Sequence, residues 1–346
     1  MPTGSWTANL LLSGGALAYR RLVLYARSIL ESVRPDVLLL CHDRIYIETA
    51  FVRAASEQGI PTILVQEGPF CAIGHSKANN WKLRVKQWMA PAINGLGIVP
   101  SIPDYGFAGH EKVLAASEGY RRKWIDAGLA PERVQVAGIP RYDFLAGMQG
   151  LTGTPRVPRL LYLVQPFAAH GKVDPKAANI LLEQLGDALN LLADEMPFEL
   201  IVRAHPRSGG DDIGALRSRL KTPPRSDDSA IPVEQSIQQS DVVIGHYSSG
   251  LLESLIIGKP IVCLPIPPDA FAEREEASKQ HWLTQVGAPV ASEAATIRAA
   301  ILRMLQPDAV IADRSLLAEE VGTIDGRSAA RCAEAVVELA SRRRHR

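Results

Sequence analysis

A turn of sequence Gly-His-Tyr-Ser-Ser-Gly, from Gly245 to Gly250, joins an apolar run at 242–244 to an apolar stretch that ends at Gly258. We expect a strand before the turn and a helix after it. A helix N-terminus binds anions through free N–H groups and the positive end of its dipole, and the hydroxyls of Ser248 and Ser249 suit phosphate oxygens. Serine is equally an ordinary N-cap. From this turn alone, phosphate site and cap both stay open.

Glu253 stands inside the expected helix, among apolar neighbours such as Leu252 and Leu255. These neighbours leave little solvated face, and burying an unpaired carboxylate is costly. We therefore expect Glu253 to face a cleft or a partner, where it can accept hydrogen bonds from ribose hydroxyls. The alternative role is compensation of the helix dipole on a solvated face.

A second polar group, Arg203-Ala204-His205-Pro206-Arg207, follows the apolar run 200–202. Pro206 keeps His205 extended and can aim its imidazole out of the sheet end. The imidazole can then contact a nucleotide phosphate and stabilise charge as that phosphate leaves. Arg203 and Arg207 supply the cationic surroundings that a phosphate prefers. The alternative is a histidine bonded to a neighbouring carbonyl.

In the first half of the chain, Glu67 comes directly after an expected strand and before Gly68, which permits a sharp turn. Such a carboxylate can act as general base and take a proton from an acceptor hydroxyl, or it can simply cap a turn. His42 and Asp43 follow the preceding strand, where either can line an acceptor site or orient Glu67. For Asp43 we favour the N-cap of the next helix.

Short apolar runs alternate with helical patterns along the chain, which is typical of βα units and a parallel sheet. We expect strands at 10–12, 37–40, 62–66, 112–116, 133–137, 160–164, 198–203, 242–244 and 261–264. We expect helices at 22–33, 47–57, 118–127, 175–193, 212–220, 250–257, 294–305 and 328–342. Residues 68–110 show no sustained period and are predicted to form a long loop.

The chain has 346 residues, more than one hydrophobic core usually serves. Glycine, threonine and proline concentrate at 148–158, which is linker composition. We predict an α/β fold of two Rossmann-like domains, 1–150 on the acceptor side and 157–326 for the nucleotide, followed by a helix with a basic tail at 327–346. Two such parallel sheets place their ligand in the cleft between domains, outside the carboxyl ends of the strands.

Composition limits the classes of partner. A net charge of +1 gives no field that favours nucleic acid. Four cysteines without CxxC spacing, and no histidine pair with metal spacing, predict neither a metal site nor disulfides and indicate a cytoplasmic protein. No apolar run approaches a membrane span. The tail Arg342-Arg343-Arg344-His345-Arg346 can touch anionic lipid at the inner face of a membrane, although we favour a solvated helix end.

The order and spacing of four motifs resemble the GT-B fold of bacterial surface-polysaccharide transferases. These include capsule-related sialyl- and Kdo-transferases and CDP-glycerol glycerophosphotransferases. The motifs are Gln66-Glu67-Gly68, the segment 136–143, Arg203-Ala204-His205-Pro206, and the turn 245–250 continued through Glu253 to Gly258-Lys259-Pro260.

The resemblance implies a role for each matching residue. Glu67 would be the base, His205 the contact to the phosphate and leaving group, and Ser248 with Ser249 the phosphate clamp. Gln66 departs from the acid that the transferases using CMP-linked sugars carry before the base. The implied activity is an inverting, metal-independent transfer from a CMP-, CDP- or UDP-activated donor to a glycan or lipid-linked glycan, with no bound cofactor.

Two other functions stay open. UDP-N-acetylglucosamine 2-epimerases share the fold and a similar turn before a helix that carries a glutamate and ends in Gly-Lys-Pro. Their reaction needs several carboxylates, for which Glu67, Asp43 and Asp143 are the counterparts in the first domain. The third hypothesis is a non-catalytic partner in a polysaccharide assembly complex.

Overall fold

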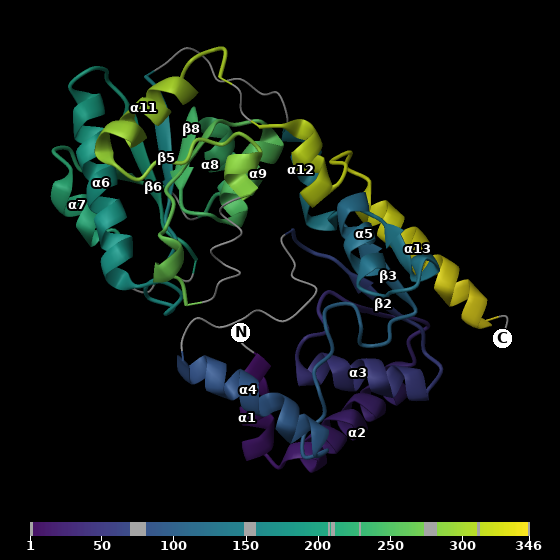
Figure 1. The fold of residues 1–346 in the computed structure, drawn as a ribbon. Helices are drawn as coiled ribbons and strands as arrows, with labels where there is room; N and C mark the ends of the chain where they lie inside the picture. Colours follow the sequence, from purple (N-terminus) through teal and green to yellow (C-terminus); the bar gives the residue numbers. More distant parts are fainter. Residues whose placement is uncertain are drawn as a thin grey trace. The chain divides into compact units, whose positions relative to one another are not determined.

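The computed structural model describes residues 3–69, 81–148, 157–206, 208, 212–227, 230–272, 282–309 and 312–344. It divides the chain into two compact units (Figure 1). Unit 1 consists of Met1–Asp143 and Ala318–Arg346, and unit 2 of Phe144–Leu317. Each unit holds one sheet, and all pairings between the named strands are parallel. The predicted fold class is confirmed.

The division between units differs from the predicted boundaries. It falls after Asp143 rather than at 150, and most of the predicted linker lies outside the described residues. The chain returns to unit 1 at Ala318, so residues 318–326 and the C-terminal helix belong with the first sheet. Two elements cross the division, the 3-10 helix η2 (Pro140–Met148) and helix α12 (Arg314–Val321).

Unit 1 has a four-stranded sheet of order β1-β2-β3-β4. Its strands are β1 (Leu38–Leu40), β2 (Thr62–Val65), β3 (Lys112–Ala115) and β4 (Val134–Val136). Its helices are α1 (Thr3–Leu12), α2 (Gly15–Val33), α3 (Tyr46–Glu57), α4 (Trp81–Gly95), α5 (Glu118–Asp126) and α13 (Ser328–Arg344), with the short 3-10 helix η1 (Pro131–Arg133).

Two predictions for unit 1 were wrong. Residues 10–12 end helix α1 instead of forming a strand, because Leu10 is buried against the α2–α3 cluster while Leu11 and Leu12 face solvent. Helix α4 lies inside the segment predicted as a long loop. Its Val85, Trp88 and Met89 are exposed, so they do not form the buried stripe by which a helix is recognised.

Helix α13 packs on the sheet of unit 1. Its Cys332, Ala335 and Leu339 join a buried cluster with Ile63 and Leu114. At its other end the tail is tied down, since Arg344 pairs with Asp36 at 2.6 Å, Arg342 pairs with Glu338 at 2.6 Å and Arg343 donates to the carbonyl of Pro35. The lipid contact of this tail stays a prediction.

Unit 2 has a five-stranded sheet of order β7-β6-β5-β8-β9. The strands are β5 (Arg159–Leu163), β6 (Glu199–Arg203), β7 (Arg225–Ser226), β8 (Val242–Gly245) and β9 (Ile261–Cys263). The helices are α6 (Pro175–Ala193), α7 (Gly214–Arg219), α8 (Val233–Gln239), α9 (Ser249–Ile257) and α11 (Ala294–Met304), with the 3-10 helix η3 (Pro268–Ala270).

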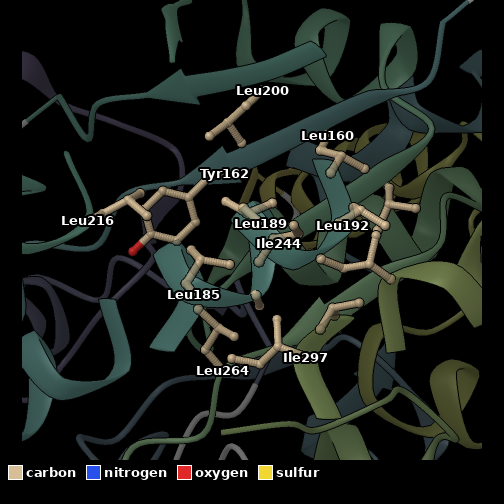
Figure 2. Packing of buried hydrophobic residues seen from close by; sticks show 14 of the residues in the cluster. Leu160, Tyr162, Leu185, Leu189, Leu192, Leu200, Leu216, Ile244, Leu264 and Ile297 are labelled. Atoms are coloured by element: carbon tan, nitrogen blue, oxygen red, sulfur yellow. The ribbon is translucent and has the colours of Figure 1, made fainter. Parts of the chain in front are cut away.

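Alternate residues of these strands face opposite sides of the sheet, as the strand period requires. One face packs on α6, α7 and α11 (Figure 2), through a cluster that includes Leu160, Tyr162, Leu189 and Ile244. Helices α8 and α9 contact the strands as well, and α9 is buried along its whole length after Ser249. Strand β8 and helix α9 therefore both lie in the interior of unit 2.

The strand order contains a reversal. From β5 the chain adds β6 and β7 on one side of the sheet and then returns to place β8 and β9 on the other. The reversal lies between β5 and β8, which are paired through Leu161↔Val243 and Leu163↔Gly245. In open α/β sheets, ligands bind outside the carboxyl ends of the strands at such a point. A ligand site is therefore expected at the loop after β8.

Within the described residues, no helix has both the length and the apolar character needed to cross a membrane.

Candidate functional site

The turn after β8 leads directly into helix α9. Ser248 is the N-cap residue, with extended backbone (φ −162, ψ 164), and its Oγ accepts the N–H of Leu251 at 3.3 Å. Ser249 is exposed and Gly250 is buried. They are the first helical residues, whose N–H groups have no acceptor within the helix. The cap interpretation thus holds for Ser248, while phosphate binding by this turn stays a prediction.

Glu253 lies one turn into α9 and is only 3% exposed. The alternative that placed it on a solvated face is therefore wrong. Its proposed hydrogen bonds to ribose hydroxyls stay a prediction.

The Gly-Lys-Pro end of α9 has a structural role. Gly258 adopts the left-handed conformation (φ 91) and its N–H donates to the carbonyls of Leu255 and Ser254. Lys259 is buried, and its Nζ donates to the carbonyl of Ser240 at 3.0 Å. The motif closes α9 and joins the C-terminal end of this helix to the end of α8.

His246 links the turn after β8 to the loop after β9. Its Nδ1 donates to the carbonyl of Leu264 at 2.9 Å, and the side chain is 4% exposed. Burial lowers the pKa of this imidazole, so the neutral form is favoured. The backbone carbonyl of Gly245 in turn accepts the N–H of Leu264 at 2.8 Å. The sequence alone gave no role for His246, which locks the loops after β8 and β9 together.

Arg203 ends β6 and its guanidinium is engaged by a loop of unit 2. It donates to Asp227 Oδ2 at 2.7 Å, Ser236 Oγ at 3.0 Å and the carbonyl of Ile231 at 2.7 Å. Ser236 Oγ also donates to Asp227 Oδ2 at 2.6 Å. These contacts hold Asp227, Ile231 and Ser236 against the sheet end. Phosphate binding by Arg203 stays a prediction beside this structural role.

His205 is half-buried, Pro206 is exposed, and Arg207 lies outside the described residues. The carbonyl of His205 accepts the N–H of Ser208 at 2.8 Å. Because β5 alone separates β6 from β8, the ends of those two strands are about 10 Å apart. His205 and Ser249 therefore border the same edge of the same sheet, and their role in one nucleotide site stays a prediction.

At the corresponding edge of unit 1, Glu67 is exposed directly after β2. Gln66 before it is fully buried; its Oε1 accepts the N–H of Ala116 at 2.9 Å and its Nε2 donates to the carbonyl of Gly68 at 3.0 Å. The thiol of Cys41, after β1, has a raised pKa, first through burial and then through the charge of Glu67. Glu67 and Cys41 thus lie near each other at neighbouring strand ends.

Asp43 is not the N-cap that we favoured. Ile45 takes that position, and the carboxylate of Glu48 accepts its N–H at 3.3 Å. Asp43 is instead fully buried and its Oδ2 accepts the N–H groups of Gly106 at 3.0 Å and Ala108 at 3.3 Å. His110, equally buried, lies 3.2 Å from the same oxygen. The carboxylate therefore anchors residues 106–110.

His42 is half-exposed, and its Nδ1 lies 3.1 Å from Glu48 Oε2. Its role at an acceptor site stays a prediction. Asp143 caps helix α13, since its two carboxylate oxygens accept the N–H groups of Ser328 at 2.9 Å and Ala329 at 2.7 Å. Of the three carboxylates predicted to face a substrate, Glu67 alone is exposed and not engaged in such a backbone anchor.

The part of the chain that the structure describes holds no cluster of three or more His, Cys, Asp or Glu side chains that could bind a metal ion. Its cysteines Cys41, Cys263 and Cys332 are free. Burial raises the pKa of Cys263 to about 12 and that of Cys332 to about 11. Both thiols are therefore protonated near neutral pH and serve as packing groups.

No protein-family model and no curated protein matches the chain. Solved structures do. UDP-GlcNAc 2-epimerase from Neisseria meningitidis bound to UDP-GlcNAc is 14% identical with a TM-score of 0.52, over 93% of this chain and 81% of that one. The enzyme from Methanocaldococcus jannaschii is 14% identical with a TM-score of 0.56, over 92% and 82%. The S. aureus protein MnaA with UDP is 12% identical with a TM-score of 0.56, over 93% and 81%.

At these identities the likeness shows the fold, which is GT-B-like, with two Rossmann-like units. The matches extend over most of both chains, so the likeness includes both units rather than one sheet.

Proposed function

We propose that this protein is an enzyme that transfers a glycosyl or glycerophosphoryl group from a CMP-, CDP- or UDP-activated donor to a glycan or lipid-linked glycan acceptor. The observation that carries the proposal is the turn 245–250 at the strand-order reversal of unit 2, where the N-terminus of α9 begins and the side chain of Ser249 is exposed. Its fold neighbours include proteins solved with UDP-GlcNAc and with UDP.

In the proposed glycosyl transfer, an acceptor hydroxyl attacks the donor carbon and the bond to the phosphate oxygen breaks. The nucleotide leaves with the electron pair, and Glu67 takes the hydroxyl proton. The N-terminus of α9, Ser249 and His205 stabilise the charge that develops on the leaving phosphate. This assignment needs no resident cofactor, and inversion follows from a single displacement.

The engagement of the carboxylates favours transfer over 2-epimerisation. The epimerase hypothesis rests on several acidic residues that reach the substrate. Asp43 is buried as a loop anchor and Asp143 caps α13, which leaves Glu67 among the three counterparts. One exposed base suits a displacement in which one proton is removed.

Nucleotide binding is tested first, by thermal shift and calorimetry with CMP, CDP, UDP and GDP, since a ligand of the native state raises its apparent stability. We expect one pyrimidine nucleotide to bind best. Absence of binding by every nucleotide would support the non-catalytic partner instead.

The reaction is tested with nucleotide sugars and acceptor glycans. We expect Glu67→Gln to keep nucleotide affinity and to lose at least a hundredfold in transfer rate, as removal of a general base does. Glu118→Gln is the matched control, because Glu118 is also exposed shortly after a strand of the same sheet. Full activity of Glu67→Gln would sink the mechanism. Conversion of UDP-N-acetylglucosamine without any acceptor would establish the epimerase.

A further inference from the structure

Unit 1 exposes large apolar side chains over α1, α2, α4 and the segment that follows α4. Leu12 is 86% exposed, Trp88 80%, Leu96 76% and Leu17 69%. Others in the same elements are Leu11, Leu24, Tyr25, Val85, Met89 and Ile98. Single exposed apolar residues are ordinary, whereas a group of this size marks an interaction surface. We call these ten residues, with Arg20 and Arg21, the α1–α2–α4 surface.

On α4 the exposed residues form one stripe. Val85, Trp88, Met89 and Ala92 are spaced i, i+3, i+4 and i+7, so they share a helix face, and all four are exposed. Leu96 continues this spacing one turn further on. An apolar stripe normally faces a core; this one faces outward.

The stripe meets the turn between α1 and α2. The N–H of Ala16 donates to the carbonyl of Ile98 at 2.7 Å, so the segment after α4 lies directly on that turn. Glycine at position 15 (φ 60) permits this close contact, since a Cβ there would lie 2.5 Å from the carbonyl oxygen of Ile98. Helix α1 contacts both α2 and α4, as Figure 1 shows. Leu12, Leu17 and Ile98 are thereby brought onto one continuous surface.

The charge of this region is predominantly positive, although Glu31 is exposed near the C-terminal end of α2. Residues 1–30 contain Arg20, Arg21 and Arg27 and no acidic residue, and residues 68–103 contain Lys77, Lys82, Arg84 and Lys86 and no acidic residue. Arg20 and Arg21 are exposed beside Leu17 and Leu24 on α2. A basic helix pair with exposed leucine, tryptophan and tyrosine is the composition of a membrane-surface segment.

A depression of about 630 Å³ lies beside the apolar residues, lined by Arg20, Arg27 and Arg53 together with Glu57. Glu57 is shared, since it pairs with Arg27 at 2.6 Å and with Arg53 at 3.2 Å. Arg20 forms no ion pair with any residue in the described ranges. The excess of guanidinium groups suits one phosphate headgroup.

We propose that the α1–α2–α4 surface docks on an anionic phospholipid membrane, with α4 lying along the interface and the arginines at the level of the phosphates. Apolar side chains enter the acyl boundary, Trp88 sits at the headgroup level, and basic side chains extend to the lipid phosphates. A second copy of the chain fits less well, because a self-complementary contact would bring two predominantly basic surfaces together. The inference does not rest on the proposed transferase activity.

Vesicle sedimentation tests the proposal. We expect the full chain to bind vesicles of phosphatidylcholine with phosphatidylglycerol, to bind pure phosphatidylcholine vesicles far more weakly, and to lose affinity as salt is raised. The variant Leu12→Ser/Trp88→Ser/Leu96→Ser should bind anionic vesicles at least tenfold more weakly, because each apolar side chain that enters the membrane contributes to the free energy of binding. In the variant Arg20→Gln/Arg21→Gln, the affinity for anionic vesicles should depend less on salt concentration. Val337→Ser is the control, because Val337 is 63% exposed on α13.

Sedimentation velocity without lipid tests whether the α1–α2–α4 surface binds a second copy of the chain instead of a membrane. A wild-type dimer that is absent in the triple variant would overturn the proposal. Equal binding to neutral and anionic vesicles would also overturn it, as would vesicle binding that the triple variant leaves unchanged. Thermal unfolding confirms that each variant folds. A fluorescence reading is independent of affinity: brominated lipids should quench the wild type more strongly than Trp88→Phe.

Discussion

Gln66 joins the carboxyl ends of β2 and β3, because its Oε1 accepts the backbone N–H of Ala116 at 2.9 Å. Its Nε2 donates in the other direction, to the carbonyl of Gly68 at 3.0 Å. The site therefore uses both a donor and an acceptor, and the side chain is fully buried. A carboxylate supplies acceptors only. This is a physical reason for glutamine at a position where the resembling transferases carry an acid.

Replacing Gln66 by glutamate should destabilise unit 1 by about 1–3 kcal/mol at neutral pH, since the Gly68 carbonyl loses its donor and a charge is buried. The introduced carboxyl has its pKa raised by burial, and its protonated form donates again, so the deficit should shrink as pH falls. Urea unfolding at two pH values measures this. Gln135→Glu is the control, because Lys112 Nζ lies 3.1 Å from Gln135 Oε1 and tolerates a carboxylate. Equal stability of Gln66→Glu and wild type would contradict the assignment.

Sequence periodicity predicted those elements whose burial follows their own pattern. Strand β8 is apolar and β2 is apolar after Thr62, both are buried throughout, and α6 was predicted from 175 to 193 as observed. Failures occurred where burial depends on distant partners. Leu10–Leu12 looks like a strand, yet helix α1 forms there, with Leu10 packed among residues of α2 and α3.

The same limit applies to the polar residues. Asp43 precedes a helix and looks like its cap, but its partners Gly106 and His110 lie more than sixty positions along the chain. The partners of Arg203, Asp227 and Ser236, are also remote in sequence, so the structural role of Arg203 was not predicted. The sequence predicted that these polar side chains lie at strand ends. It did not predict which of them already form hydrogen bonds within the fold.

The two serines of the turn should separate stability from binding. Ser248→Ala removes the cap of α9 and should cost about 1 kcal/mol of unfolding free energy. Ser249→Ala changes an exposed side chain, so its stability should stay within roughly 0.5 kcal/mol of wild type. Under the proposed function Ser249→Ala should weaken nucleotide binding by about tenfold, the scale of one hydrogen bond to a charged group. Calorimetry and urea unfolding of both variants check this; unchanged nucleotide affinity would remove Ser249 from the site.

The Arg203–Asp227 pair should matter for stability even without nucleotide. Asp227→Asn leaves a mostly buried guanidinium undercompensated and should cost roughly 3 kcal/mol. Arg203→Lys should also destabilise, because one ammonium does not reach Asp227, Ser236 and Ile231 as the planar guanidinium does. Arg225→Lys, at the exposed ion pair with Glu199, is the control and should change little. A stable Arg203→Lys with weakened nucleotide binding would assign Arg203 to the ligand instead.

His246 should make the stability of unit 2 fall in mild acid. Its folded pKa lies below the ordinary 6.5 because burial disfavours the imidazolium. Below 6.5 the unfolded chain therefore takes up a proton that the folded chain does not, and the stability present above 6.5 is lost as pH falls toward the folded pKa. His246→Asn keeps a donor for the Leu264 carbonyl but does not titrate, so its unfolding free energy should depend less steeply on pH below 6.5. Denaturant unfolding across this range compares the slopes. A wild-type slope no steeper than that of His246→Asn would show that the imidazole accepts its proton within the folded protein.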